Sequence, residues 1–281
     1  MSDIKQRLTM ALPDLPKKLA HAARYALDNP QCIAFDSMRT VATACGVASP
    51  TMLRLARALD FESYEDFRGE FQQSVASRGF ADRAAALRDV SSTKGKSTVS
   101  ERIAQAAEDN IALTMQSLDA TAVEYFAQSV KNAERTFILG SGSMHWMAAL
   151  MESTGQMAIR GLRTDHSGSA TLVETISSIT ENDTILVLAF APYAKETVHS
   201  ASYAKSRGAK VFAITDKASS PLAEHAEKVF IAPTDSPHYF PSVVSVTLMI
   251  EILLSAAVAA SDTLDRIKQR ERIRRDSGAY M

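Results

Sequence analysis

Four short apolar runs in the second half of the chain constrain the fold more than any other feature. They occupy residues 136–139, 184–190, 210–215 and 228–231. The stretches between them have helical character, at residues 143–160, 195–207 and 219–226. Because the runs are apolar throughout instead of alternating with polar residues, they predict parallel strands buried on both faces and joined by right-handed helical crossovers. We therefore expect an α/β domain of the αβα type, with a further short strand around residues 161–165.

The first 77 residues predict helices only, and residues 36–68 have the pattern of a helix-turn-helix. Either Asp36 or Ser37 would cap the first helix of this motif, which places Val41 and Ala44 on one face. Gly46 would then occupy the turn with a positive φ. In the second helix, Ser49 is expected as the N-cap and Pro50 as the first helical residue.

The second helix of the motif leaves polar side chains on its outer face. A short helix of this kind fits the major groove of DNA and can read the edges of bases. We expect Ser49, Thr51 and Arg54 to reach bases or phosphates. Arg57 and Arg39 are expected to contact the DNA backbone. An ordinary helical hairpin within a core is the alternative interpretation.

Composition limits the possible functions. The chain has 281 residues, a net charge of −1 and 46% hydrophobic residues, so it can form one large or two ordinary domains. Without a general positive charge, DNA contact would depend on a local patch, present in two copies in a dimer. Cys32 and Cys45 form no disulfide framework or metal-ligand cluster, and we expect both to be small buried side chains in a reducing cytosol.

No cofactor or metal ion is expected, and no signal sequence is evident at the N-terminus. The apolar segment 243–260 approaches the length of a membrane span, but Glu251 lies in its middle. We therefore interpret it as a core or interface helix of a cytoplasmic protein without a membrane partner. The expected organisation is a helix-turn-helix domain at 1–77, a polar linker at 78–98 and a second domain at 99–281, which begins with a long helix at residues 100–118.

A ligand of the second domain would bind where its parallel strands end. Three polar loops follow the predicted strands. Their candidate ligand-binding residues are Gly140, Ser141, Gly142 and Ser143 in the first, Tyr193, Lys195 and Thr197 in the second, and Ser219 and Ser220 in the third. Backbone N–H groups and a helix dipole after the first strand favour an anion there, and Ser143 would cap the helix that follows. The first loop lacks the third glycine and the acidic residue of a dinucleotide fingerprint, so NAD is not expected.

Several segments together resemble one family. The stretches GVASPTMLRLARALDF, FILGSGSMHWMAAL and ITDKASSPLAEHAEKVF, with the terminal RIKQRERIRRDSGAYM, resemble RpiR-type (MurR/RpiR) transcriptional regulators. That resemblance spans nearly the whole chain and implies a C-terminal sugar isomerase (SIS) domain that senses phosphorylated sugars. We expect a homodimer or homotetramer that binds a palindromic DNA operator at the bacterial nucleoid and has no enzymatic activity.

This sequence departs from the family pattern at two places. The family usually has a Ser-x-Ser-Gly-x-Thr-like loop after the second strong strand, whereas residues 189–194 offer no Ser or Thr hydroxyl and Pro192 lacks an N–H. Tyr193 and Lys195 would have to substitute for the missing donors. In the DNA-reading block, Ala48 stands where Ser is common and Asp60 where Gly is usual, so Ser49 would take over the capping.

A sugar-phosphate isomerase or another carbohydrate-binding enzyme is the alternative function, because SIS domains also occur in isomerases. Aldose–ketose isomerisation requires a general base and an acid that opens the ring. The candidate acid–base residues are His145, His166, Glu174, Glu196 and His238. No spacing links any two of them, and the helix-turn-helix favours a sensor. We expect the effector to change the balance between two dimer geometries.

Overall fold

The computed structural model describes residues 4–76, 80–81, 83–85, 87, 98–164 and 171–278. The chain forms two compact units. One comprises Met1–Asp109 with Asp235–Ser242, and the other comprises Asn110–Thr234 with Val243–Met281. The division falls at Asp109, whereas the sequence placed the second domain from residue 99. Ala106 explains the difference, since it packs in the N-terminal core. Most of the linker expected at 78–98 lies outside the described residues.

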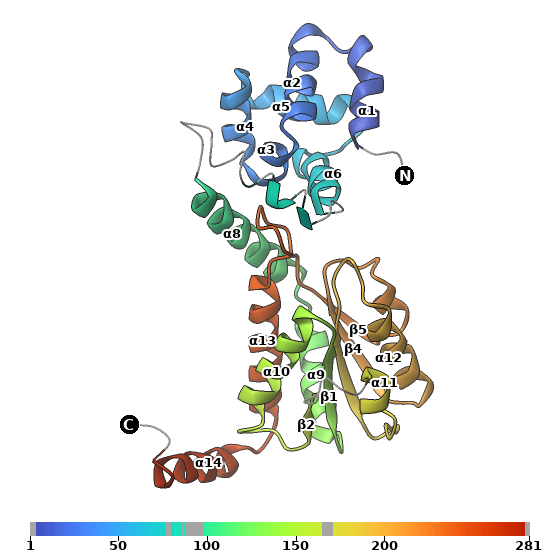
Figure 1. Cartoon of the computed structure of the whole chain (residues 1–281), viewed down its shortest axis with the longest axis vertical. Helices are drawn as coiled ribbons and strands as arrows, with labels where there is room; N and C mark the ends of the chain where they lie inside the picture. The colour runs from blue at the N-terminus through green and yellow to red at the C-terminus, as the bar shows by residue number, and fades with distance from the viewer. Residues whose placement is uncertain are drawn as a thin grey trace. The chain divides into compact units, whose positions relative to one another are not determined.

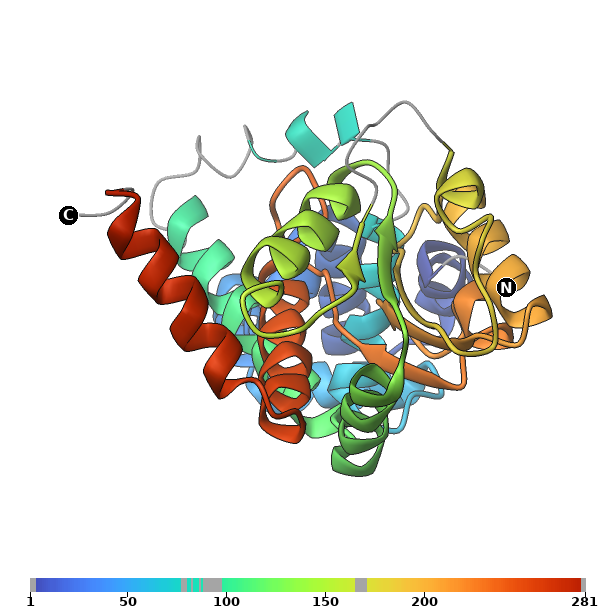
Figure 2. The same ribbon diagram turned by 90° about the horizontal axis from the view of Figure 1, so that it is seen from below.

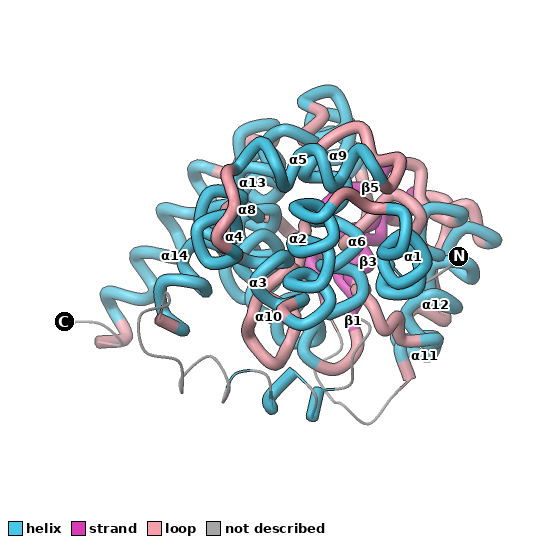
Figure 3. Tube along the Cα trace, turned by 90° about the horizontal axis from the view of Figure 1, so that it is seen from above, coloured by secondary structure: helices cyan, strands magenta, loops and turns pink. Residues whose placement is uncertain are grey.

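Short helices build the first unit (Figure 3). They are α1 (Ile4–Ala11), η1 (Leu12–Asp14), α2 (Lys17–Asp28), α3 (Pro30–Phe35), α4 (Met38–Cys45), α5 (Ser49–Ala58) and α6 (Tyr64–Ala76). Their apolar faces meet in one core, in which Phe67 and Phe71 are fully buried and pack edge to face with ring centroids 5.0 Å apart. The helical interpretation of this region is confirmed.

Helices α4 and α5 form the helix-turn-helix motif. Ser37 caps α4, because its side chain accepts a hydrogen bond from the Thr40 N–H. Asp36 does not cap the helix but is buried and forms an ion pair with Arg102, at an N···O distance of 3.2 Å. Gly46 has φ 72° at the end of α4, the left-handed conformation that the tight turn requires.

Two details of the motif correct the sequence interpretation, and a third concerns the residue after α5. Ala44 is exposed, and the buried face of α4 consists of Val41, Ala42 and Cys45. Ser49 is the first residue of α5 and does not cap it, since Ala48 occupies the N-cap and no side chain caps the helix. After α5, Asp60 adopts φ 62°, the left-handed conformation that favours glycine.

The second unit is built around a parallel five-stranded sheet with the order β2-β1-β3-β4-β5. The strands are β1 (Thr136–Gly140), β2 (Leu162–Arg163), β3 (Thr184–Leu188), β4 (Lys210–Thr215) and β5 (Lys228–Ile231). The helices that accompany them are α9 (Ala120–Asn132), α10 (Ser143–Gly155), α11 (Leu172–Thr175), α12 (Lys195–Ser206), α13 (Val244–Ala260) and α14 (Leu264–Asp276). Helix α8 (Val99–Ser117) crosses the division between the units. The predicted α/β class and all five predicted strands are confirmed.

Two predicted helices differ from the observed elements. The helix expected at 143–160 ends at Gly155, where a Cβ atom would lie 2.5 Å from Leu162 and 2.8 Å from Leu254. Residues 219–226 form only the short 3₁₀ helix η2 (Pro221–Glu224). Helix α9 did not feature in the sequence interpretation.

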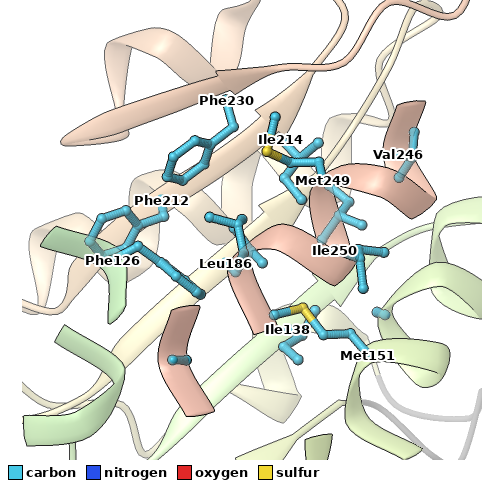
Figure 4. Packing of buried hydrophobic residues seen from close by; sticks show 14 of the residues in the cluster. Phe126, Ile138, Met151, Leu186, Phe212, Ile214, Phe230, Val246, Met249 and Ile250 are labelled. Carbon is cyan, nitrogen blue, oxygen red and sulfur yellow. The ribbon is translucent and has the colours of Figure 1, made fainter. Parts of the chain in front are cut away.

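The strands alternate their side chains between two apolar layers, so helices cover both faces of the sheet (Figure 1). Ile138, Leu186 and Phe212 pack against α9, α10 and α13, as Figure 4 shows. In Figure 2, α10 and α13 lie side by side on this face. The neighbouring residues Phe137 and Leu139 point to the layer that contains α11 and α12.

A buried ion pair ties the strands together at their amino ends. Asp183 accepts two hydrogen bonds from Arg135, at 2.9 Å and 2.6 Å, and one from the Thr180 N–H at 2.8 Å. Burial alone would raise the pKa of Asp183, but the bonds from Arg135 and Thr180 outweigh it and hold that pKa below its ordinary value.

Across the described residues, no single helix is long and apolar enough to cross a membrane. Helices α13 and α14 reach the length and apolar composition of a membrane-spanning segment only when they are taken together, and the chain bends by 113° between them.

Candidate functional site: the sheet edge and the helix-turn-helix

The order of the strands identifies where a ligand of the second unit would bind. From β1 the chain passes through α10 to β2 on one side, whereas β3 leads through α12 to β4 on the other side. Helices α10 and α12 consequently lie on opposite faces of the sheet. Open α/β sheets bind ligands at such a switch point, beyond the carboxyl ends of the strands. Here that position lies between β1 and β3, which end level with each other at the pair Gly140 and Leu188.

The loop after β1 depends on its two glycines. A Cβ atom at Gly140 would lie 2.6 Å from the Cβ of Met144, so only glycine allows α10 to pack this closely. Gly142 has φ 62° and ψ −126°, the first central position of a type II′ turn closed by the Met144 N–H and the Ser141 carbonyl. Ser143 is the first residue of α10 and not its cap, which is Gly142. The start of α10 therefore has no side-chain cap.

The structure brings the first and second loops together through two hydroxyl groups. The Oγ of Ser141 and the Oγ1 of Thr197 are 3.0 Å apart and hydrogen-bonded, although 56 residues separate them in the sequence. Thr197 lies in the first turn of α12 and is fully buried, while Ser141 and Ser143 are half-buried. Helix α12 also starts without a side-chain cap, because Ala194 occupies that position.

Tyr193 faces the third loop. Its hydroxyl donates a 2.6 Å hydrogen bond to Asp216, which also accepts one from Thr215. Burial and the bond to Asp216 raise the pKa of Tyr193 above its ordinary value. The sequence placed Asp216 in the third loop, directly after β4, but not among the candidate ligand-binding residues. Ser220 is buried and caps η2 by accepting a hydrogen bond from the Leu222 N–H.

The remaining expected ligand residues are open to solvent. Lys195, at the first position of α12, and Ser219, in the loop after β4, are exposed. Within the part of the chain that the structure describes, no group of three or more His, Cys, Asp or Glu residues is placed to hold a metal ion.

The two candidate glutamates for acid–base chemistry serve structural roles. Glu174 completes a capping box with Thr171 at the start of α11, and these hydrogen bonds lower its pKa. Glu196 accepts a 2.6 Å hydrogen bond from the Leu172 N–H. Both carboxylates therefore bind backbone N–H groups at the N-terminus of α11.

Of the candidate histidines, the structure describes His145 and His238, and these two belong to different compact units. His145 packs edge to face against Trp146 on α10. His238 belongs to the first compact unit, where its Nδ1 lies 3.0 Å from the Phe240 carbonyl oxygen. His166 lies outside the described residues.

Helix α5 exposes the side chains expected to read DNA. Arg54 and Arg57 are exposed at a spacing of three residues, so they lie on neighbouring positions of one helix face. Thr51 and Ser49 are half-buried near its N-terminus, and Arg39 is exposed on α4. The opposite face of α5 is buried through Met52, Leu55 and Ala56. Helix α5 thus packs one face on the domain core and leaves the other open to solvent, as the recognition helix of a helix-turn-helix does.

Comparisons with known proteins agree with both halves of this description. Residues 2–78 match the family model described as a helix-turn-helix domain of the rpiR family, and residues 129–259 match the SIS domain. The chain is 24% identical over 270 residues to the HTH-type transcriptional regulator HexR of Pseudomonas aeruginosa, covering 95% of this chain and 91% of that one. It is 24% identical over 225 residues to an HTH-type transcriptional regulator of Haemophilus influenzae, covering 80% and 76%.

Two solved structures share the fold. The Vibrio vulnificus NanR protein complexed with ManNAc-6P superposes with a TM-score of 0.58 at 20% identity, covering 96% of this chain and 97% of that one. The sugar isomerase domain of an RpiR transcription factor from Sphaerobacter thermophilus gives 0.57 at 21% identity, covering 62% and 98%. With a helix-turn-helix unit and a SIS unit each matched to its family, the chain belongs to the RpiR family of transcriptional regulators.

Proposed function

We propose that this regulator binds a palindromic operator as a homodimer or homotetramer, and that a sugar-derived effector bound at the sheet edge alters its DNA affinity. The observation that carries the proposal is helix α5, which exposes Arg54 and Arg57 while its other face is buried. Such a regulator acts on chromosomal DNA, in the cytoplasm and at the nucleoid.

The start of α5 supports contact with the DNA backbone. The Ser49 N–H has no partner within the helix and Ala48 supplies no side-chain cap, whereas Pro50 has no N–H and the Thr51 N–H bonds to the Ala48 carbonyl at 2.8 Å. A phosphate oxygen fits such a position, because the helix dipole adds to the hydrogen bonds. Ser49 and Thr51 would add hydroxyl donors there, Arg54 would reach bases, and Arg57 and Arg39 would bind phosphates.

Helix α8 supports the association of two copies. Ile103, Ile111 and Met115 lie on one stripe of this helix at multiples of four residues and are 36%, 39% and 50% exposed. The buried stripe of α8 contains Ala106 together with the polar residues Asn110 and Thr114. A second copy that covers the apolar stripe would remove this exposed surface from water, and it would pair two recognition helices for a palindrome.

The sheet edge supports an anionic, sugar-derived effector, either a phosphosugar or a related compound. Loops 140–143, 191–197 and 215–220 meet there, and α10 and α12 start there without side-chain caps. The NanR structure that shares this fold contains ManNAc-6P. We propose binding without turnover, because Glu174 and Glu196 are both engaged with backbone N–H groups. The effector would favour one of two dimer geometries.

Replacing Arg54 with Ala in the full-length protein tests the DNA-reading role. Loss of a base contact costs about 1–3 kcal/mol per half-site, so operator affinity should fall by at least about tenfold. Arg207→Ala is the matched control, because this arginine is also exposed but lies directly after α12 in the other unit. Fluorescence anisotropy at several salt concentrations measures both variants. Unchanged operator affinity for Arg54→Ala would remove α5 from the interface.

A further inference from the structure

Helix α8 is bound to the helix-turn-helix unit through its first half, in addition to carrying an exposed apolar stripe. We infer that α8 sets the distance between the two recognition helices of a dimer, and that Asp109 is a positioning residue for the spacing of the two operator half-sites. This inference rests on the proposed function and deepens it. Asp109 acts through Arg68 and the helices that support α5, without touching DNA.

The first of two anchors is a buried ion pair at the start of the helix-turn-helix. Arg102 of α8 and Asp36 lie 3.2 Å apart, and their side chains are 3% and 8% exposed. Asp36 directly precedes Ser37, the N-cap of α4. Ala106, one turn further along α8, packs in the core of the first unit. The start of α4 and the first half of α8 are therefore fixed to each other.

The second anchor connects α8 with α6 and α3. Arg68 of α6 donates from Nη2 to the Oδ2 of Asp109, at 2.5 Å, and from Nε to the Ala34 carbonyl, at 3.0 Å. Gln105 donates to the other carboxylate oxygen of Asp109, at 3.1 Å. Helices α4 and α6 both pack against α5. The two anchors therefore reach the recognition helix through two different neighbours.

The two anchors have opposite polarity and define the register of α8. Arg102 supplies the cation of the first, whereas Asp109 supplies the anion of the second. They lie about two turns apart, or about 10.5 Å along the helix, so neither a shift of α8 by one turn nor its reversal would keep both pairs. Buried ion pairs add little net stability, but they can define one arrangement where apolar contacts allow several. The apolar contact of Ala106 alone would not define it.

The covalent connection between α6 and α8 is too long to fix the position of α8. Residues 77–98 separate the two helices, and each residue of an extended chain spans about 3.3 Å. The anchors therefore decide where α8 lies against the first unit. Helix α8 itself is unbroken from Val99 to Ser117 and contains neither glycine nor proline. A displacement of one end is consequently carried along the whole helix.

Pairing of two copies through α8 then fixes the separation of two α5 helices. The stripe of Ile103, Ile111 and Met115, which pairs the copies in the proposed dimer, is distinct from the buried stripe that contains Arg102 and Ala106. One helix therefore carries both the pairing surface and the anchors. Adding one base pair between two half-sites moves them about 3.4 Å apart and rotates one by about 35° relative to the other. A dimer held by α8 follows that change only by breaking an anchor or releasing one half-site.

The test compares operator duplexes that differ only in spacing. The half-sites of the palindrome selected from genomic DNA are placed at their natural separation and at separations one base pair shorter or longer. Fluorescence anisotropy measures binding of the full-length protein, and circular dichroism shows that each variant is folded. Asp109→Ala removes the second anchor at a side chain that is 31% exposed, and Asp109→Glu retains its charge. Glu108→Ala is the matched control, because Glu108 is the exposed acidic residue next to Asp109 on α8.

We expect the wild type to bind the natural spacing about tenfold or more tightly than either altered spacing, because an altered duplex engages only one half-site. Asp109→Ala should lower this ratio by about threefold or more, as the loss of a partly exposed ion pair allows. Asp109→Glu should lose less of the ratio, and Glu108→Ala should match the wild type.

Three results would overturn the inference and leave the regulator intact. They are an unchanged ratio in Asp109→Ala, a loss of affinity in that variant that is equal at every spacing, and a wild type that binds all spacings alike. If the wild type bound no palindrome at any spacing, the proposed function would fail and the inference with it.

Discussion

Replacement of Asp183 by Asn should destabilise the second unit in a pH-dependent manner. The Asp183 carboxylate is fully buried, and it bonds to both the Nε and the Nη2 of Arg135 and to the Thr180 N–H. Asparagine keeps the shape and can still accept a hydrogen bond from Thr180. It removes the charge that compensates the guanidinium of Arg135.

The magnitude follows from how each partner is buried. Removing one member of a buried ion pair costs about 3–5 kcal/mol, because the remaining charge is uncompensated. The Arg135 side chain is 22% exposed and can regain some water, so the expected loss is smaller, about 2–3 kcal/mol at pH 7. The pKa of Asp183 is lowered in the folded protein. Its stabilisation is therefore complete above the unfolded pKa of about 3.9 and is lost as the pH falls through the folded pKa.

Urea denaturation of the full-length protein, followed by far-UV circular dichroism, measures this difference at pH 7 and at decreasing pH. The gap between Asp183→Asn and the wild type should narrow below about pH 4. Glu181→Gln is the control, since Glu181 is exposed and two residues away. A loss below about 0.5 kcal/mol at pH 7, the range of ordinary surface substitutions, would refute the reasoning, as would a gap that did not change with pH.

Three further substitutions test other parts of the structure. Asp60→Gly should stabilise the first unit by about 1 kcal/mol in urea denaturation, because φ 62° suits glycine; a lower midpoint would contradict this. Gly142→Ala should destabilise the second unit by about 1–3 kcal/mol in a thermal unfolding assay, because alanine is strained at φ 62° although an added Cβ atom would meet no neighbouring atom. An unchanged melting temperature would argue against the turn. Ile111→Glu should weaken self-association about tenfold or more in analytical ultracentrifugation, and an unchanged association constant would exclude the α8 stripe from the interface.

Much of the fold could be predicted because its strands are buried on both faces. The runs that became β1, β3 and β4 are almost wholly buried, as strands inside a parallel sheet are, whereas β5 at the end of the strand order is only partly buried. Helix α9 was not predicted, because only Leu118 and Asp119 separate it from α8, and two residues are too few to interrupt the helical pattern of apolar residues. Asp119 caps α9, so one polar residue carried the signal.

The candidate site was harder to predict from the sequence than the fold, because it depends on which loops become neighbours. The contact between Ser141 and Thr197 joins loops 56 residues apart and requires β1 to lie beside β3. The pair Tyr193 and Asp216 likewise requires β3 beside β4. Helix α5 begins at Ser49, one residue before the expected start at Pro50, so Ala48 is the N-cap despite the higher N-cap propensity of Ser49.

Selection of bound sequences from fragmented genomic DNA, followed by affinity measurement against random DNA over a range of salt, tests the central claim most directly. We expect an enriched palindrome whose half-sites lie roughly 34–36 Å apart, centre to centre. The protein should prefer it to random DNA by about a thousandfold or more, with affinity falling steeply as salt rises. Failure to enrich any sequence, with equal affinity for all DNA, would contradict the account.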